Sequence, residues 1–237
     1  MSLRRAWEGQ AENWIAWTRL GLDDRFFRAH AARFLELVPP PGRLTLDLGA
    51  GEGRVGRLLR QRGHRVIDVD TSRAAVTAAA ELSGEPAIVG DAARLPLRSG
   101  AGDLAIAFMS FQDVDDMPSA VREARRVLEP QSAFVFAIVH PINSAGRFAP
   151  ATPDNDDLRP FVMTESYFEH RHYADDVERD ESFMRFESMH RPLETFSRAL
   201  EDAGFVVEAL REIGDAGEPW RRVPLFLDVR ARRRAEA

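Results

Sequence analysis

The sequence contains no cysteine and no lysine among its 237 residues, so all 32 basic side chains are arginines. The absence of cysteine excludes a disulfide framework, a zinc–thiolate site and a cysteine nucleophile. The absence of lysine excludes a P-loop phosphate lysine, a Schiff-base enzyme and a lysine general base. We attach no functional meaning to the arginine-only composition itself.

Long apolar runs and an excess of positive charge are also missing. No stretch approaches the roughly 18 consecutive apolar residues of a membrane span. The formal net charge is −6, and the arginines are scattered among acidic residues, whereas a nucleic-acid partner requires a stripe of positive charge. Trp7, Glu8 and Glu12 stand where a signal peptide would need an apolar core. The sequence therefore predicts a cytoplasmic protein with no nucleic-acid partner and no membrane partner.

Short apolar segments alternate with helical segments in the first two thirds of the chain. Such alternation predicts an α/β fold, in which a parallel sheet is covered by helices on both faces. Ligands of these sheets bind beyond the carboxyl ends of the strands. The expected strands are 44–48, 65–70, 86–89, 104–109 and 133–139, and the expected helices between them are 55–63, 72–82 and 119–128.

The segments on either side of this core have other patterns. Residues 6–38 predict a helix with a break at 21–23. Residues 141–182 interrupt the alternation, and a loop of this length is typical of a lid or of a disordered segment. Within it we expect two strands, 161–172 and 183–190, joined by an acidic turn at 174–181. Beyond it we expect helix 192–203 and an antiparallel terminal hairpin of strands 205–210 and 225–230.

A glycine-rich loop, Asp47-Leu48-Gly49-Ala50-Gly51-Glu52-Gly53, follows the first strand directly. Glycine at every second position lets the backbone approach a ligand closely, and the helix that follows offers free N–H groups. The same glycines, with Gly56, also satisfy the G-x-G-x-x-G pattern of dinucleotide-binding proteins. The loop by itself does not decide between these ligands.

Two carboxylates follow the next strands. Asp70 ends the second strand, where it can accept hydrogen bonds from both hydroxyls of a ribose. Gly90-Asp91-Ala92 follows the third strand, where a carboxylate and a backbone N–H can bind an adenine edge. Ligand contacts at three adjacent strand ends describe a pocket for an adenosine with a short tail.

The motifs LDLGAGEGRVGRLL (46–59), VIDVDTS (66–72), GDAARLPL (90–97), DLAIAFMSFQDVDD (103–116) and EARRVLEP (123–130) together cover about 43–140. In these segments the chain resembles the class I S-adenosylmethionine-dependent methyltransferases, in particular the small-molecule group related to ubiquinone and menaquinone biosynthesis. Residues 190–205 resemble a later helix of the same family. The lid matches nothing recognisable.

The resemblance implies a Rossmann-like fold with a seven-stranded, mostly parallel sheet, an N-terminal helical cap and a lid insertion after strand five. It implies a single methyltransferase domain, 1–237, with cap 1–40, cofactor-binding core 43–140, lid or acceptor insertion 141–190, and C-terminal helix and terminal hairpin 191–237. The implied cofactor is S-adenosyl-L-methionine, with S-adenosyl-L-homocysteine as product. Its implied contacts are Trp14, Asp47, Gly49, Ala50, Gly51, Asp70, Thr71, Asp91, Ala92, Phe108 and Met109.

The resemblance also implies methyl transfer to an O or C atom, less readily N, of a small-molecule acceptor by in-line displacement. Gln112 and Asp113 stand where this family often has a pair of histidines, so they are not assigned a catalytic role. Histidine is the natural candidate for a general base because its pKa is nearest neutrality. We expect His140, at the end of strand five, to serve, with His190 and His172 as weaker candidates. His170 and His172 lack a third ligand, so we expect no metal.

Two other functions stay open at this point. One is a non-catalytic protein that binds adenosylmethionine or adenosylhomocysteine, which would bind the cofactor without turnover. The other is an NAD(P)-dependent oxidoreductase, although the chain lacks the lysine of the usual tyrosine–lysine pair. A homodimer is neither required nor excluded by the sequence.

Overall fold

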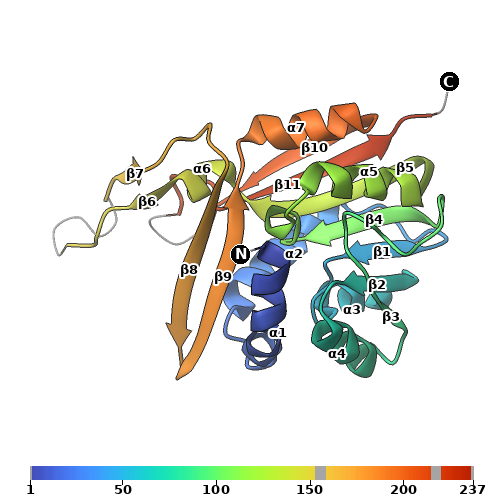
Figure 1. Cartoon of the computed structure of the whole chain (residues 1–237), viewed down its shortest axis with the longest axis horizontal. Helices are drawn as coiled ribbons and strands as arrows, with labels where there is room; N and C mark the ends of the chain where they lie inside the picture. Colours follow the sequence, from blue (N-terminus) through green and yellow to red (C-terminus); the bar gives the residue numbers. More distant parts are fainter. Residues whose placement is uncertain (1, 153–158, 215–219, 236–237) are drawn as a thin grey trace.

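The short apolar segments between residues 45 and 139 form the parallel part of a seven-stranded sheet (Figure 1). The computed structural model describes residues 2–152, 159–214 and 220–235. The strands lie in the order β10-β11-β5-β4-β1-β2-β3, and only β11 runs against its neighbours. They are β1 (Thr45–Leu48), β2 (Val66–Asp70), β3 (Ala87–Val89), β4 (Gly102–Phe108), β5 (Leu128–Val139), β10 (Phe205–Ile213) and β11 (Phe226–Arg233).

Helices cover both faces of this sheet. The helices of eight residues or more are α1 (Leu3–Arg19), α2 (Asp24–Leu37), α3 (Arg54–Gln61), α4 (Arg73–Ser83), α5 (Met117–Val127) and α7 (Leu193–Asp202). The predicted break at 21–23 separates α1 from α2. The expected α/β fold, with its seven-stranded sheet, N-terminal helical cap and antiparallel terminal hairpin, is confirmed.

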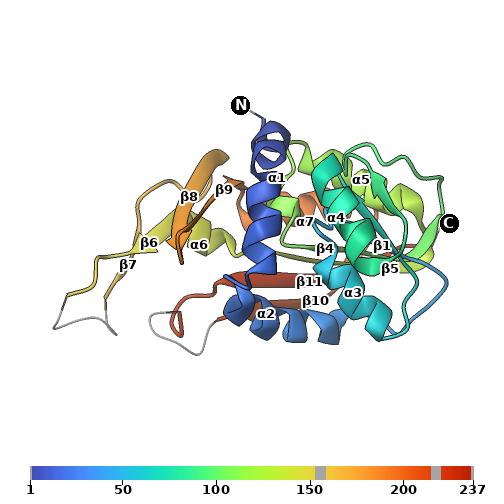
Figure 2. The same cartoon turned by 90° about the horizontal axis from the view of Figure 1, so that it is seen from below.

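The alternation of buried side chains on β5 explains why the sheet has two apolar faces. Phe134 and Phe136 pack on one side with α5 and α7, while Val135 and Ala137 pack on the other side with α2 and α3. A strand that is buried on both faces reads as a continuous apolar run, which is the pattern found in the sequence. Figure 2 shows α2 and α3 below the sheet and α5 and α7 on its opposite side.

The insertion after β5 contains two separate ribbons. The short helix α6 (Pro141–Ala145) leads into β6 (Gly146–Phe148), which pairs with β7 (Phe161–Met163). The second ribbon is a long hairpin of β8 (Arg171–Arg179) and β9 (Ser182–His190), and it lies beside α1 (Figure 1).

The expected strand 161–172 and acidic turn 174–181 are therefore wrong. Residues 174–179 continue strand β8, and the turn consists of Asp180 and Glu181 alone, both with positive φ (47° and 63°). Positive φ at both central residues is the geometry that two-residue hairpin turns prefer, although they usually contain asparagine or glycine there. Because Asp180 and Glu181 differ from the residues usually found in such turns, the turn could not be recognised from the sequence. The link 214–222 before β11 lies partly outside the described residues.

Candidate active site

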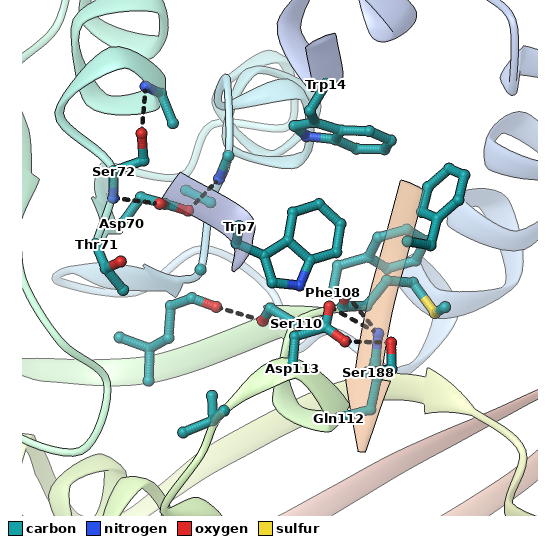
Figure 3. Close-up of a pocket in the computed structure, with 18 of the residues that line it drawn as sticks. Trp7, Trp14, Asp70, Thr71, Ser72, Phe108, Ser110, Gln112, Asp113 and Ser188 are labelled. Atoms are coloured by element: carbon teal, nitrogen blue, oxygen red, sulfur yellow. Dashed lines mark hydrogen bonds between the residues drawn. The ribbon is translucent and has the colours of Figure 1, made fainter. Parts of the chain in front are cut away.

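A cavity of about 670 Å³ opens at the carboxyl ends of β1, β2 and β4. Its walls come from the glycine loop, from α1 and α2, from the segment after β4 and from the β8–β9 hairpin (Figure 3). All eleven predicted cofactor-contact residues line this cavity. The volume is within the usual range of small-molecule sites.

The glycine loop forms one wall because its backbone takes a conformation that other residues avoid. Gly49, Gly51 and Gly53 have φ values of 74°, 58° and 78°. A Cβ on Gly49 would lie 2.4 Å from the Cβ of Ser110, and a Cβ on Gly51 would lie 3.0 Å from Nε1 of Trp14. The loop thus passes close to the cap and to the segment after β4, and it leaves its backbone facing the cavity.

Asp70 joins the end of β2 to this loop. Its Oδ2 accepts a hydrogen bond from the N–H of Gly51 at 2.8 Å, and its Oδ1 accepts one from the N–H of Ser72 at 2.9 Å. Burial raises the pKa of Asp70, and these two backbone donors act against the shift. Thr71, the next residue, also lines the cavity. The carboxylate therefore lies in the cavity wall with its position fixed by the backbone (Figure 3).

Asp47, at the carboxyl end of β1, is a buried carboxyl group behind the loop. It is 1% exposed, and its Oδ2 has no hydrogen-bond partner among the described residues. Burial, and then the neighbouring Asp68, raise its pKa well above the usual value. An acceptor atom that faces a cavity without a partner is suited to a cationic or N–H-bearing ligand group.

Asp91 and Ala92 lie at the turn after β3. Asp91 Oδ1 accepts a hydrogen bond from the N–H of Ala93 at 2.8 Å, and Oδ2 lies 3.6 Å from the guanidinium of Arg4 in α1. Ala92 is buried against the apolar core. The turn therefore presents a fixed carboxylate next to a small apolar surface.

Phe108 and Met109 leave β4 at the floor of the cavity. The Phe108 ring packs edge-on against Phe27 and Phe34 of α2, with centroids 5.8 and 5.0 Å away. Met109 has φ of 57°, so the chain turns sharply there. The turn directs the following residues toward the cavity.

Aromatic side chains from α1 and from the hairpin form the roof. The rings of Trp7, Trp14 and Trp17 each meet Phe186 of β9 edge-on, at centroid distances of 6.0–6.4 Å. Trp7 Nε1 donates to the carbonyl of Glu187 at 2.9 Å, which fixes α1 to β9. Trp14 lies against the glycine loop, while Trp17 is buried and also reaches the cavity.

A polar cluster lies opposite the glycine loop. Ser188 Oγ donates to Asp113 Oδ1 at 2.6 Å, and Gln112 Nε2 donates to Asp113 Oδ2 at 3.3 Å. Gln112 is 5% exposed, and its Oε1 has no partner among the described residues. Burial raises the pKa of Asp113 well above the usual value, and burial and then Asp113 raise the pKa of Tyr173. These four side chains line the cavity. Figure 3 shows Gln112, Asp113 and Ser188 of this cluster.

Only part of this cluster was accessible to sequence reasoning. Gln112 and Asp113 stood out as a departure from the family pattern. Ser188 and Tyr173 reach the cavity on the hairpin, in a segment that matches no recognisable motif. No sequence signal identifies Ser188, because its position depends on where the hairpin docks.

The expected base His140 is buried outside the cavity. Its Nε2 lies 3.1 Å from Glu212 Oε1, and its Nδ1 accepts a hydrogen bond from the N–H of Ile142 at 3.1 Å. The two ring nitrogens therefore interact with the start of α6 and with the end of β10, away from the cavity. The assignment of His140 as the general base does not fit this position. The residues that line the cavity include one histidine, His30 of α2, which sequence reasoning missed.

The weaker candidates do not line the cavity either. His190 has both nitrogens engaged, with Ser144 Oγ at 2.7 Å and the Tyr167 carbonyl at 2.9 Å. His172 lies on β8 and is exposed. In the part of the chain that the structure describes, no group of three or more His, Cys, Asp or Glu is arranged to hold a metal ion. Over the same residues, no helix combines the length and apolar character of a membrane span.

Comparison with known proteins agrees with this geometry. Residues 46–136, which contain the glycine loop, Asp70 and Asp91, match a family model described as a methyltransferase domain. The chain is 33% identical over 113 residues to a ubiquinone/menaquinone biosynthesis C-methyltransferase of Caulobacter vibrioides. That match covers 42% of this chain and 45% of the relative. The similarity to a methyltransferase domain thus extends over residues 46–136 of the chain.

A second curated relative and a solved structure show further similarity in sequence and in fold. A malonyl-[acyl-carrier protein] O-methyltransferase of Serratia marcescens is 31% identical over 98 residues, which is 41% of this chain and 38% of that protein. The matched part of the chain thus spans less than half the length of both curated relatives. A solved S-adenosylmethionine-dependent methyltransferase of Mesorhizobium loti superposes with a TM-score of 0.68 at 23% identity, over 85% of this chain and 96% of that one.

Proposed function

We propose that this protein transfers a methyl group from S-adenosylmethionine to an O or C atom, less readily N, of a small-molecule acceptor. The observation that carries the proposal is the joint lining of one cavity by the glycine loop, Asp70 and Asp91. These residues come from three separate strand ends, and together they match the polar groups of an adenosine with an amino-acid tail.

The cavity residues fit this cofactor. Asp70 has two carboxylate oxygens beside the loop and can accept hydrogen bonds from ribose hydroxyls, while Asp91 and the backbone of Ala92 suit the adenine edge. Asp47 offers a buried oxygen without a partner among the described residues, which suits the ammonium group of the amino-acid tail. Because Gly49 and Gly51 have no side chains, the space beside the loop stays free for that tail. A side chain at either position would not fit there.

The opposite side of the cavity suits the acceptor. Aromatic rings from α1, α2 and β9 supply an apolar wall, and Gln112, Asp113 and Ser188 supply polar atoms. Small-molecule sites commonly combine an apolar lining with a few placed polar groups that orient the ligand. The two relatives named above methylate carbon in one case and oxygen in the other, according to their names, so they leave the acceptor atom open.

When bound, the cofactor supplies an activated methyl group on a sulfonium whose leaving group is neutral. The protein then has to align the acceptor with the methyl and exclude water. Alignment alone can supply about 7–11 kcal/mol of barrier reduction in well-oriented systems. The Trp7, Trp14 and Phe186 roof excludes water, and the polar cluster around Asp113 orients the acceptor.

Calorimetric titration with S-adenosylhomocysteine, with NAD as the control ligand, tests the cofactor. We expect binding of S-adenosylhomocysteine and none of NAD. A panel of phenols, enols, quinols and carboxylic acids, followed by detection of S-adenosylhomocysteine as product, then tests transfer. Binding of NAD alone would contradict the proposal, and cofactor binding without any turnover would favour a non-catalytic binding protein.

A further inference from the structure

A histidine–carboxylate pair lies at the end of the cavity formed by α2 and β11. His30 Nε2 is 2.6 Å from Asp228 Oδ1, and the two side chains are 3% and 1% exposed. Their positions are 198 residues apart in sequence and meet only because α2 packs under β11. His30 lines the cavity, and Asp228 lies behind it.

The surroundings fix the orientation of the His30 ring. The ring stacks on Phe226 at a centroid distance of 4.2 Å and an interplanar angle of 8°, and it lies 4.8 Å from the ring of Phe108. An ionised Asp228 can only accept, so Nε2 carries the proton and donates it to this carboxylate. Nδ1 is then an unprotonated nitrogen, and it has no hydrogen bond to the described residues.

The pair lies close to the expected reaction centre. In the sheet register, Asp228 is opposite Ala137, and Ala137 is opposite Phe108 at the carboxyl end of β4. The next residue, Met109, is at the floor of the cavity. Other charged side chains that line the cavity include Asp23 and Arg54, which pair with each other at 2.6 Å, and Arg179, whose guanidinium lies 5.7 Å from the centre of the Phe26 ring. Asp228 is therefore the charged partner of the His30 ring.

We propose that His30 is the general base of methyl transfer, with Asp228 as the residue that positions it. The inference rests on the proposed function and gives the acceptor a chemical class: a phenolic or enolic hydroxyl. The acceptor oxygen forms a bond to the methyl carbon while the carbon–sulfur bond breaks, and that electron pair stays on sulfur. The hydroxyl proton passes to Nδ1 of His30 and then to solvent. Charge and atoms balance without any co-reactant.

The need for a general base restricts the chemical class of the acceptor. A carboxylic acid is already ionised at neutral pH and needs no base, whereas a phenol or enol keeps most of its protons. The wall around His30 is apolar and aromatic, which suits a flat hydroxylated ring or enol. The rings of Phe108 and Phe226 contact His30, and Phe27 packs edge-on against Phe108.

The first test measures the ring itself in the complex with S-adenosylhomocysteine. Long-range ¹H–¹⁵N NMR spectra report the tautomer of each histidine, and the His30→Gln variant assigns the His30 signals. We expect a neutral ring that carries its proton at Nε2 and leaves Nδ1 unprotonated. A neutral ring that carries its proton at Nδ1 would overturn the proposal.

The second test uses phenols of graded acidity as acceptors. We expect His30→Gln to lower kcat about 10²–10⁴-fold for the least acidic phenol and progressively less for more acidic ones. The Kd for S-adenosylhomocysteine stays unchanged in this variant. Asp228→Asn gives a smaller loss with the same dependence on acidity, because an amide permits the wrong tautomer.

The alternatives give different results. An equal loss for every phenol, or weaker S-adenosylhomocysteine binding in His30→Gln, would assign His30 to cofactor positioning and overturn its role as base. Cofactor binding with no turnover of any phenol or enol would overturn the hydroxyl acceptor. Failure of the wild-type protein to bind S-adenosylhomocysteine would instead overturn the proposed function itself.

Discussion

The carboxylate of Asp70 accepts a hydrogen bond from the backbone N–H of Gly51, at 2.8 Å. This bond links the end of β2 to the middle of the glycine loop, so one side chain both shapes the loop and lines the cofactor cavity. A carboxylate in this position can hold a ribose only when the loop is already in place. The two parts of the cofactor site are therefore a single unit.

Replacement of Asp70 by alanine tests this unit. We expect Asp70→Ala to weaken S-adenosylhomocysteine binding by about 1.5–3 kcal/mol, roughly 10- to 150-fold in Kd, because hydrogen bonds to a charged group are lost. Calorimetry measures the change. Asp70→Asn is the matched control, since its amide oxygen still accepts from Gly51, and its loss is smaller. Equal affinity in wild type and Asp70→Ala would show that the ribose lies elsewhere.

Two glycines at contrasting positions give a second prediction. Gly51→Val places a branched side chain at a φ of 58° and within 3.0 Å of Trp14, so we expect S-adenosylhomocysteine binding to disappear in calorimetry. Gly9, on the open surface of α1, has no atom within 4 Å of the place where an alanine methyl would lie. Gly9→Ala therefore keeps cofactor binding and raises stability by about 0.5–1 kcal/mol. A Gly51→Val protein that still binds would place the ligand away from the loop.

Asp113 gives a prediction about pH. Burial raises its pKa in the folded protein above that in the unfolded chain. Its contribution to stability is therefore complete below the unfolded pKa and is lost as the pH rises through the folded pKa. Asp113→Asn does not ionise, so we expect its Tm to fall less than that of wild type between about pH 4 and 8. Parallel Tm curves for the two proteins would contradict the predicted protonation of Asp113.

Arg191 holds the segment after β4 in place. This buried guanidinium donates to the carbonyls of Gln112, Val114 and Asp115. Arg191→Ala leaves these acceptors with fewer partners, and we expect a loss of at least about 2 kcal/mol in the free energy of unfolding. Arg198→Ala, which removes an exposed i,i+4 ion pair with Glu194 in α7, is the matched control and has little effect. Denaturant unfolding measures both, and equal losses would contradict the structural role of Arg191.

The cavity wall that we propose for the cofactor could be predicted from the sequence because its carboxylates lie at the ends of strands. Asp47, Asp70 and Asp91 each end or follow a short apolar run, and the carboxyl ends of parallel strands meet at one edge of a sheet. Local pattern and tertiary position therefore agree at these residues. Trp14 does not follow a strand, and the contact expected for it came from the family resemblance; the side chain lines the cavity.

The acceptor side could not be predicted, because its positions depend on long-range packing. His30 reaches the cavity through the docking of α2 under β11, and Ser188 through the docking of a hairpin after a segment without a recognisable motif. His140 follows a strand as the cofactor carboxylates do, yet its ring turns toward Glu212 and Ile142. A strand end predicts where the backbone goes and leaves the direction of the side chain undetermined.

The bond between Trp7 and Glu187 spans 180 residues of sequence. During synthesis α1 emerges from the ribosome long before β9, so its tryptophans lack the Phe186 ring while β1 to β5 are being made. Closing so large a loop carries an entropic cost that is recovered only when the contact forms. The roof of the cavity therefore assembles only after β9 has been synthesised. Until then the nascent chain exposes an aromatic surface that favours chaperone binding or self-association.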